Sequence, residues 1–146
     1  MIRTLRSECT IAPDKKLRVT ARLGGNSEEL LRRNAELVRL LAGIGELGIE
    51  ADRKTKENRP EGAIGLAGSG FEVFVFIAEA VDTDALKKKF AKEIERDNAF
   101  INGLRAKLEN EQFVKNAPTE LVAGERAKLE NSLARIGKLE SYMRGL

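Results

Sequence analysis

The sequence predicts an α+β protein in which a small β-α-β-β domain with an antiparallel sheet precedes a long antiparallel two-helix coiled-coil hairpin. Three observations lead to this fold class. Apolar and polar residues alternate over Leu17–Leu23, which is typical of a half-buried strand. The segment Phe71–Ala78 is almost continuously apolar, as in a central strand covered by other elements. After Asp82 the pattern changes to narrow apolar stripes with heptad spacing.

In the small domain, one helix is expected between Ser27, which can cap its N-terminus, and Gly43, which can end it. Gly68-Ser69-Gly70 predicts a tight turn of a β-hairpin. Three further segments are expected: a weaker strand at Ile44–Ala51, an exposed loop at Asp52–Gly62 and a strand at Ala63–Ala67. A helix that buries its apolar face on such a sheet gives the β-α-β-β domain, which we assign to residues 17–82.

The C-terminal part, residues 83–146, reads as two helices of equal length joined by a short breaker, with Asp82 as N-cap. Asp97 interrupts the first stripe, whose apolar members are Phe90, Ile94, Ile101, Leu104 and Leu108. The second stripe repeats every seven residues and comprises Val122, Leu129, Ile136 and Met143, with Leu133, Leu139 and Leu146 beside them. Each helix of roughly 28 residues would be about 40 Å long.

The hairpin tip is predicted near residues 112–118. Phe113 and Val114 are expected to pack across it, and the pattern groups Phe90, Phe100 and Phe113 as seam or hinge residues. Ala117 is expected to leave helical geometry because Pro118 follows it, and Pro118 suits the first turn of the returning helix.

The composition argues against most kinds of catalytic or metal site. The chain has no His, and its single Cys forms neither an internal disulfide nor a zinc site, so Cys9 is expected to be a small, half-buried apolar residue. The segment GLAGSG lacks the Lys-Ser/Thr pair and the following helix that a phosphate-binding loop needs. We therefore expect no catalytic residue, no metal and no bound cofactor in this chain. No segment is apolar enough to cross a membrane, and a cytoplasmic location is expected.

The net charge is +3, and the whole excess lies after Asp82, where 13 basic residues face 10 acidic ones. A row of cations along a slim hairpin could follow a phosphate backbone without reading sequence. The candidate RNA-binding residues are Lys88, Lys92, Arg96, Lys115, Arg126 and Lys128. Two alternatives remain open: a solvated, salt-bridged coiled-coil surface, and a hairpin that binds another protein through its apolar seam.

The C-terminal sequence FVKNAPTELVAGERAKLE resembles the C-terminal arm of bacterial valyl-tRNA synthetases. In that family a Phe-Val-x-x-Ala-Pro phrase joins two coiled-coil helices. The matching residues, within the phrase and after it, are Phe113, Val114, Ala117, Pro118, Val122, Glu125, Arg126, Lys128 and Leu129. The upstream stretch IRTLRSECTIAPDKKLRV is also similar to the family's link after its anticodon-binding helices, so residues 1–16 would be the tail of that helical region.

The resemblance implies a tRNA-binding appendage that lies along the outer corner of a valine-specific tRNA. The family's enzymes activate valine with ATP and transfer it to tRNA, so ATP and Mg²⁺ would belong to the catalytic domain of a parent enzyme. The nucleotide-binding signatures of that domain do not occur here. The chain is thus expected to be a non-catalytic, C-terminal part of a longer synthetase, with tRNA and the rest of that synthetase as its partners.

Overall fold

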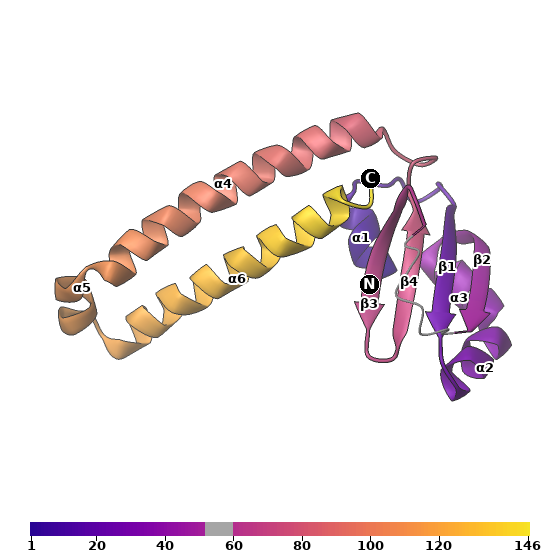
Figure 1. Cartoon of the computed structure of the whole chain (residues 1–146), viewed down its shortest axis with the longest axis horizontal. Helices are drawn as coiled ribbons and strands as arrows, with labels where there is room; N and C mark the ends of the chain where they lie inside the picture. Colours follow the sequence, from indigo (N-terminus) through magenta and orange to yellow (C-terminus); the bar gives the residue numbers. More distant parts are fainter. Residues whose placement is uncertain (52–59) are drawn as a thin grey trace. The chain divides into compact units, whose positions relative to one another are not determined.

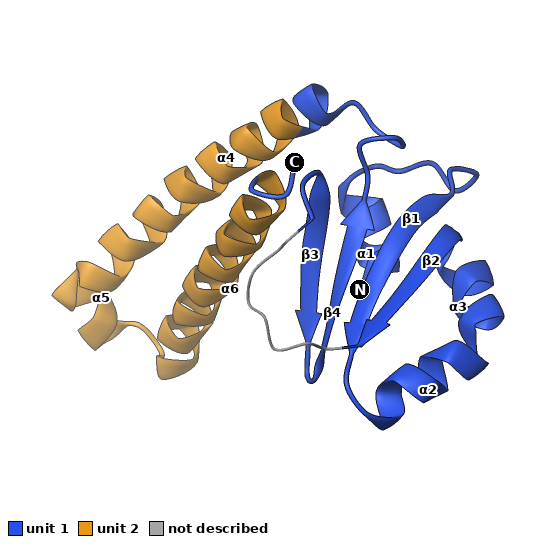
Figure 2. Cartoon of the chain, turned by 45° about the vertical axis from the view of Figure 1, so that its right-hand side comes forward, with its two compact units in different colours: residues 1–86, 144–146 blue, residues 87–143 orange. Residues whose placement is uncertain are grey.

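The computed structural model of the chain describes residues 1–51 and 60–146, so most of the loop predicted at Asp52–Gly62 lies outside the described residues. The chain divides into two compact units, which Figure 2 colours blue and orange. Unit 1 comprises residues 1–86 and 144–146, and unit 2 comprises residues 87–143. The architecture is mixed, with one four-stranded sheet and a long C-terminal helical region. The division into segments 1–16, 17–82 and 83–146 stays a prediction.

Unit 1 is built on a sheet with the strand order β2-β1-β4-β3. Its strands are β1 (Leu17–Leu23), β2 (Ile44–Ala51), β3 (Ala63–Gly68) and β4 (Phe71–Phe76), as Figure 1 shows. The predicted β-hairpin turn is confirmed, because Gly68 pairs with Phe71 and leaves Ser69 and Gly70 as the loop. Gly70 has φ 77°, a left-handed conformation that glycine adopts without steric cost. Strand alternation in β1 is also confirmed, since Leu17, Val19, Ala21 and Leu23 are all buried.

The prediction of a purely antiparallel sheet is wrong. Strand β1 pairs with β4 in the antiparallel sense but with β2 in the parallel sense. The reason is the connection: a helical crossover after β1 returns the chain to the starting end of the strand, so the next strand runs in the same direction.

The crossover is not the single helix predicted after Ser27. It contains two helices, α2 (Asn26–Arg33) and α3 (Ala35–Ala42), and no side chain caps α2, whose N-cap is Gly25. Asn34 separates the helices: its side-chain Nδ2 donates to the Leu30 carbonyl at 2.8 Å. An asparagine that bonds the local backbone in this way competes with the helical ladder, which explains the break. The predicted stop at Gly43 is confirmed, with φ 68°.

The N-terminal helix α1 (Ile2–Glu8) belongs to unit 1. Leu5 and Cys9 are buried, so Cys9 is more deeply placed than the half-buried position predicted for it. The guanidinium of Arg6 joins three chain segments. It donates to the carbonyls of Ala12 (2.7 Å), Pro13 (3.2 Å), Lys15 (2.8 Å) and Gly43 (3.3 Å). These bonds fix the link before β1 to the turn before β2.

The C-terminal helices are α4 (Thr83–Glu109), α5 (Glu111–Asn116) and α6 (Thr119–Met143). Asp82 caps α4 as predicted, because its Oδ1 accepts from the Ala85 amide at 3.0 Å. Both views draw α4 and α6 side by side (Figures 1 and 2). Ion pairs join residues 93 and 97 to 135 and residue 107 to 125, so the two helices run in opposite directions.

Candidate nucleic-acid interface

The facing sides of α4 and α6 form a narrow apolar seam in unit 2. Its buried apolar residues are Phe90, Ile101, Leu104, Val122, Ile136, Leu139 and Tyr142. Phe90 and Tyr142 meet as a tilted aromatic pair with ring centroids 6.1 Å apart. A seam one or two side chains wide holds the helices together but leaves most of each helix surface in contact with solvent.

Two carboxylates, Asp97 and Glu125, occupy positions in this seam where the heptad pattern favours apolar residues, and a third, Glu93, lies at its edge. Glu125 is only 4% exposed, and the side chains of Asp97 and Glu93 are 13% and 25% exposed. Arg135 reaches across from α6 to both α4 acids, at 2.9 Å from Glu93 and 3.4 Å from Asp97. A buried carboxylate needs such compensation, because an unpaired charge away from water is strongly destabilising.

Glu125 has two partners, one on each helix. Lys128 Nζ lies 2.9 Å from its Oε1, and Lys107 Nζ lies 3.3 Å from its Oε2. The hydrogen bond from Lys128 lowers the pKa of the Glu125 carboxyl below its ordinary value, which outweighs the opposite effect of burial, and Lys107 lowers this pKa further. Glu125 therefore stays ionised and fixes both lysine side chains near the seam.

The cations gather on one face of the paired helices. In each helix, the residue immediately before every seam position lies about 100° around the helix axis from it, so these residues form a stripe along one flank. Antiparallel helices place their equivalent flanks on the same side, and the ion pairs that cross from Lys107 and Arg135 agree with this geometry. The two stripes hold six cations and one acid, Glu93, which directly precedes Ile94 and is paired with Arg135. Together with Lys92, which borders the α4 stripe, these cations form the cationic face: Lys89, Lys92, Arg96, Lys107, Lys128, Arg135 and Lys138.

The opposite face, made by the residues that follow the seam positions, has a different character. Its charged residues are Glu95, Arg105, Glu109, Arg126, Glu130 and Glu140. Two cations and four acids leave this face negative. The contrast between the two faces means that the positive charge of unit 2 is directed to one side and not spread around the helices.

The six candidate residues from the sequence do not all lie together. Arg96 and Lys128 lie in the stripes of the cationic face, and Lys92, one helical turn before Arg96, borders the α4 stripe. Arg126 lies on the opposite face, and Lys88, two positions before the seam residue Phe90, points away from the seam. Lys115 lies on α5, where it pairs with Glu111 at 3.2 Å.

The candidate set predicted from the sequence lacks Lys89, Lys107, Arg135 and Lys138. The signal that finds them is positional, since each directly precedes a seam residue. The candidates Lys88, Lys92 and Arg96 are spaced four residues apart along α4, and this spacing selects Lys88 but not the adjacent Lys89. The positional rule requires the seam to be assigned correctly, and only the burial pattern does that.

Two apolar residues lie outside the seam, contrary to prediction. The sequence pattern groups Phe100 with seam or hinge residues, but it is 50% exposed. Its position directly before Ile101 places it within the cationic face. Leu133 is predicted beside the second stripe and is 44% exposed, because Ser132 takes the half-buried position at the seam.

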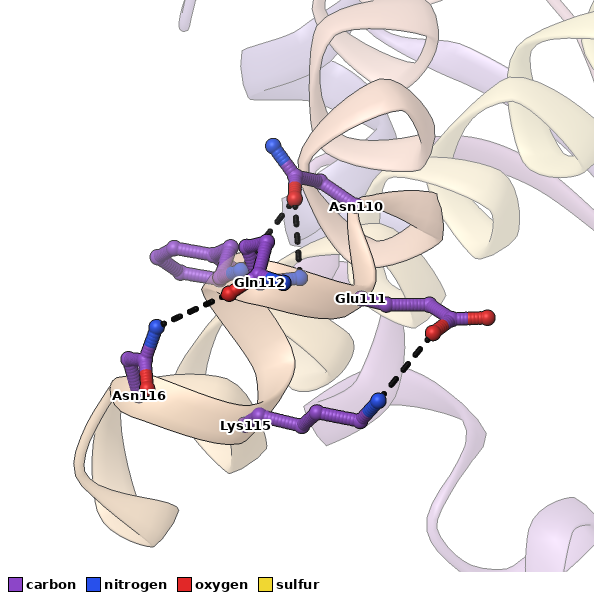
Figure 3. Close-up of polar contacts among 6 residues, drawn as sticks. Asn110, Glu111, Gln112, Lys115 and Asn116 are labelled. Atoms are coloured by element: carbon purple, nitrogen blue, oxygen red, sulfur yellow. Dashed lines mark hydrogen bonds and ion pairs between the residues drawn. The ribbon is translucent and has the colours of Figure 1, made fainter.

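The tip between α4 and α6 is more ordered than a simple helix stop. Asn110 ends α4 and caps α5, with its Oδ1 accepting from the amides of Gln112 (3.0 Å) and Phe113 (3.2 Å), as Figure 3 shows. The predicted break at Ala117 is confirmed by its extended backbone, with φ −76° and ψ 149°. The sequence pattern indicates a helix stop from Phe113 onward, but residues up to Asn116 form α5.

Comparison with known proteins adds to this geometry. Residues 82–146 match the family described as the valyl tRNA synthetase tRNA binding arm. The chain is 41% identical to a valine–tRNA ligase of Treponema denticola over 146 residues, which cover 99% of this chain and 16% of that protein. It is 30% identical to the valine–tRNA ligase of Treponema pallidum, over 97% of this chain and 16% of that protein.

The paired helices with their charged face thus belong to the class of tRNA-binding arms carried by aminoacyl-tRNA synthetases. The matched region is such an arm and not a catalytic domain. More particularly, the chain belongs to the valyl-tRNA synthetase family and corresponds to a C-terminal region of those enzymes.

The chain spans about one sixth of the length of these curated relatives, 16% in both cases. Within the described residues, no group of three or more potential ligands could hold a metal ion. Over residues 1–51 and 60–146, no helix is long and apolar enough to cross a membrane.

Proposed function

We propose that unit 2 binds the backbone of a valine-specific tRNA through the cationic face, as an appendage of a longer valyl-tRNA synthetase. In this proposal α4 and α6 pack as a coiled-coil hairpin that reaches the outer corner of the tRNA. Most of the contacts are to phosphates and to the shape of the RNA, because structured RNA is recognised mainly in this way.

One observation carries the proposal: the cationic face has seven cations beside one acid, Glu93, which is paired with Arg135, whereas the opposite face is negative. The separation has a physical cause. Asp97 and Glu125 lie in the seam and Glu93 lies at its edge, paired with Arg135, so most of this negative charge is withdrawn from the surface while the basic groups stay accessible. Lys107, Lys128 and Arg135 remain 56–59% exposed although they are paired.

Lys92 and Arg96 are the strongest individual candidates. Both are exposed and form no ion pair with any residue that the structure describes. From Lys89 to Lys107 the stripe on α4 advances by 18 positions, or about 27 Å at 1.5 Å per residue. This length suits contacts with several successive phosphates.

The proposal is tested by neutralising two cations on each of the two faces in turn. The double variant Lys92→Gln/Arg96→Gln should weaken tRNA binding and reduce the slope of log K against log salt by about 1 to 2, since each phosphate contact contributes just under one unit. The control Arg105→Gln/Arg126→Gln removes the same charge from the opposite face and should leave both quantities nearly unchanged. Equal effects of the two doubles, measured by fluorescence anisotropy with labelled tRNA, would mean that net charge and not the cationic face governs binding.

The alternative is an arm that binds another protein through apolar contacts, which the exposed Leu121 and Leu133 on α6 favour. The salt dependence of the binding affinity distinguishes the two functions. Phosphate contacts weaken steeply with salt, whereas an apolar helix contact hardly responds.

The activity of the whole synthetase is also part of the proposal. A valine–tRNA ligase of this family would use ATP and Mg²⁺ in a catalytic domain encoded elsewhere in the polypeptide, and would act in the cytoplasm. This chain would bind the tRNA at a point distant from the site of that reaction. Phe113, Val114, Ala117 and Pro118 would maintain the turn that connects the helices.

A further inference from the structure

The crossover helices of unit 1 expose leucines on the side that faces away from the sheet. Three of them lie at i, i+3 and i+4 on α3: Leu37 (54% exposed), Leu40 (74%) and Leu41 (62%). This spacing places them on one helix face. Val38 and Ala42 occupy the other side, are less exposed and lie toward β2, against which α3 packs (Figure 2).

This arrangement reverses the usual orientation of an amphipathic helix. The small residues lie on the sheet, and the large apolar residues point outward. Leu30 on the neighbouring α2 is also 65% exposed. The leucine surface of α2 and α3, defined as Leu30, Leu37, Leu40 and Leu41, presents on the order of a few hundred Å² of apolar area, the size at which exposed patches mark interaction sites.

The charges around the leucine surface are neutralised locally. Arg32 pairs with Glu28 at 2.9 Å, Arg39 with Glu36 at 3.0 Å, and Arg33 with Glu29. An RNA-binding surface needs cations that can replace the counterions of phosphates, and these arginines are already paired. An apolar centre with a neutral polar rim is instead the composition of a protein–protein interface.

We propose that the leucine surface is the docking site for an apolar surface on the remaining part of the same synthetase polypeptide. This inference rests on the proposal that the chain works within a longer synthetase, and it does not depend on RNA binding by unit 2. The relatives leave about five sixths of their length outside the region that this chain spans, 16% of each. A covalently connected partner is present at high effective concentration, so a small patch is sufficient for docking.

The size of the surface argues against a second copy of the chain. A stable complex usually buries roughly 800 Å² on each partner, which exceeds the leucine surface. Interfaces between domains of one polypeptide can be smaller because the linkage removes most of the entropy cost of association.

The test is hydrogen exchange of α3 amides, without tRNA, in the 146-residue chain and in the full-length synthetase that contains it. Docking should slow exchange in α3 by about tenfold or more in the full-length protein. The double variant Leu37→Lys/Leu40→Lys should abolish this extra protection. In the 146-residue chain the same variant should leave the melting temperature within about 2–3 °C, because both leucines are exposed.

The matched control is Leu121→Lys/Leu133→Lys, which changes two exposed leucines of α6 and should leave α3 protection intact. Equal α3 exchange in the two proteins overturns the inference. Sedimentation of the 146-residue chain at micromolar concentration provides a second check. If the chain forms dimers and the double variant Leu37→Lys/Leu40→Lys abolishes them, the leucine surface binds a second copy and the inference is overturned. Because no RNA is present, a failure of tRNA binding by the cationic face changes none of these results.

Discussion

The two units use their ion pairs in different ways. In unit 1 the arginines of α2 and α3 bond glutamates three or four residues away on the same helix. In unit 2, Arg135 and Lys107 reach acids on the opposite helix. The first pattern neutralises a helix surface, whereas the second draws acids into the seam and leaves cations outside.

The difference shows how similar compositions produce different surfaces. Exposed pairs within one helix contribute little to stability, but they remove net charge from the surface they cover. Pairs that cross a seam place the acid in the interior and keep the cationic side of the pair in solvent. Unit 1 consequently presents a neutral, leucine-rich surface, and unit 2 presents a cationic one.

The largest expected effect comes from removing unit 2. Replacing residues 87–143 by a short Gly/Ser linker in the full-length synthetase should raise KM for tRNA by about tenfold or more, because the phosphate contacts are lost. Residues 144–146 are retained since they belong to unit 1. Valine activation without tRNA, measured by pyrophosphate exchange, should stay nearly unchanged. A similar loss in both assays would show that unit 2 supports the catalytic domain and not tRNA binding.

The second prediction compares glycines in the two units. A Cβ added to Gly145 would lie 2.5 Å from the Ala63 carbonyl oxygen, so Gly145→Ala should lower the free energy of unfolding of unit 1 by about 1–3 kcal/mol. A Cβ on Gly137 meets nothing within 4 Å, so Gly137→Ala in α6 should stabilise unit 2 by about 0.5–1 kcal/mol. Hydrogen exchange resolved by unit gives both values. Stabilisation by Gly145→Ala would disprove the packing of the C-terminal residues on β3.

The third prediction concerns the exposed aromatic ring of the cationic face. Phe100→Ala should raise the Kd for tRNA about fivefold, or about 1 kcal/mol, through loss of a stacking contact with an unpaired base. Thermal stability should hardly change, since the ring is half exposed. Leu133→Ala, at similar exposure on the opposite face, is the control. If the two variants bind tRNA equally well, Phe100 makes no contact with a base.

The smallest expected effect is a dependence of stability on acid pH. Because the folded pKa of Glu125 is lowered, the unfolded chain binds more protons between the folded and unfolded values. The stabilisation is therefore complete above the ordinary pKa of about 4.5 and is lost as the pH falls through the lower folded value. Thermal melts from pH 6 to pH 3 should decline less steeply for Glu125→Gln than for the native chain. Parallel pH profiles would show that Lys107 and Lys128 do not perturb this carboxyl.

Several elements could be predicted because their causes are local. The alternation in β1, the left-handed Gly70 in the β3–β4 turn, the Asp82 cap and the break before Pro118 each depend on residues within a few positions. The helix break at Asn34 is local as well, but its signal is weak, since asparagine is compatible with either outcome until its side chain is seen to bond Leu30.

By itself, the sequence determined where most strands and helices lie, the position of the chain reversal and the family, because each depends on residues that are close together in the chain. Only the tertiary structure decided the parallel pairing of β1 with β2, the outward orientation of the α3 leucines and the membership of the cationic face. The physical reason is that these features depend on which side of an element becomes buried. If the seam is assigned one residue too early, Lys88 takes the place of Lys89 in the cationic face. The sequence alone does not show which of the neighbouring residues is buried.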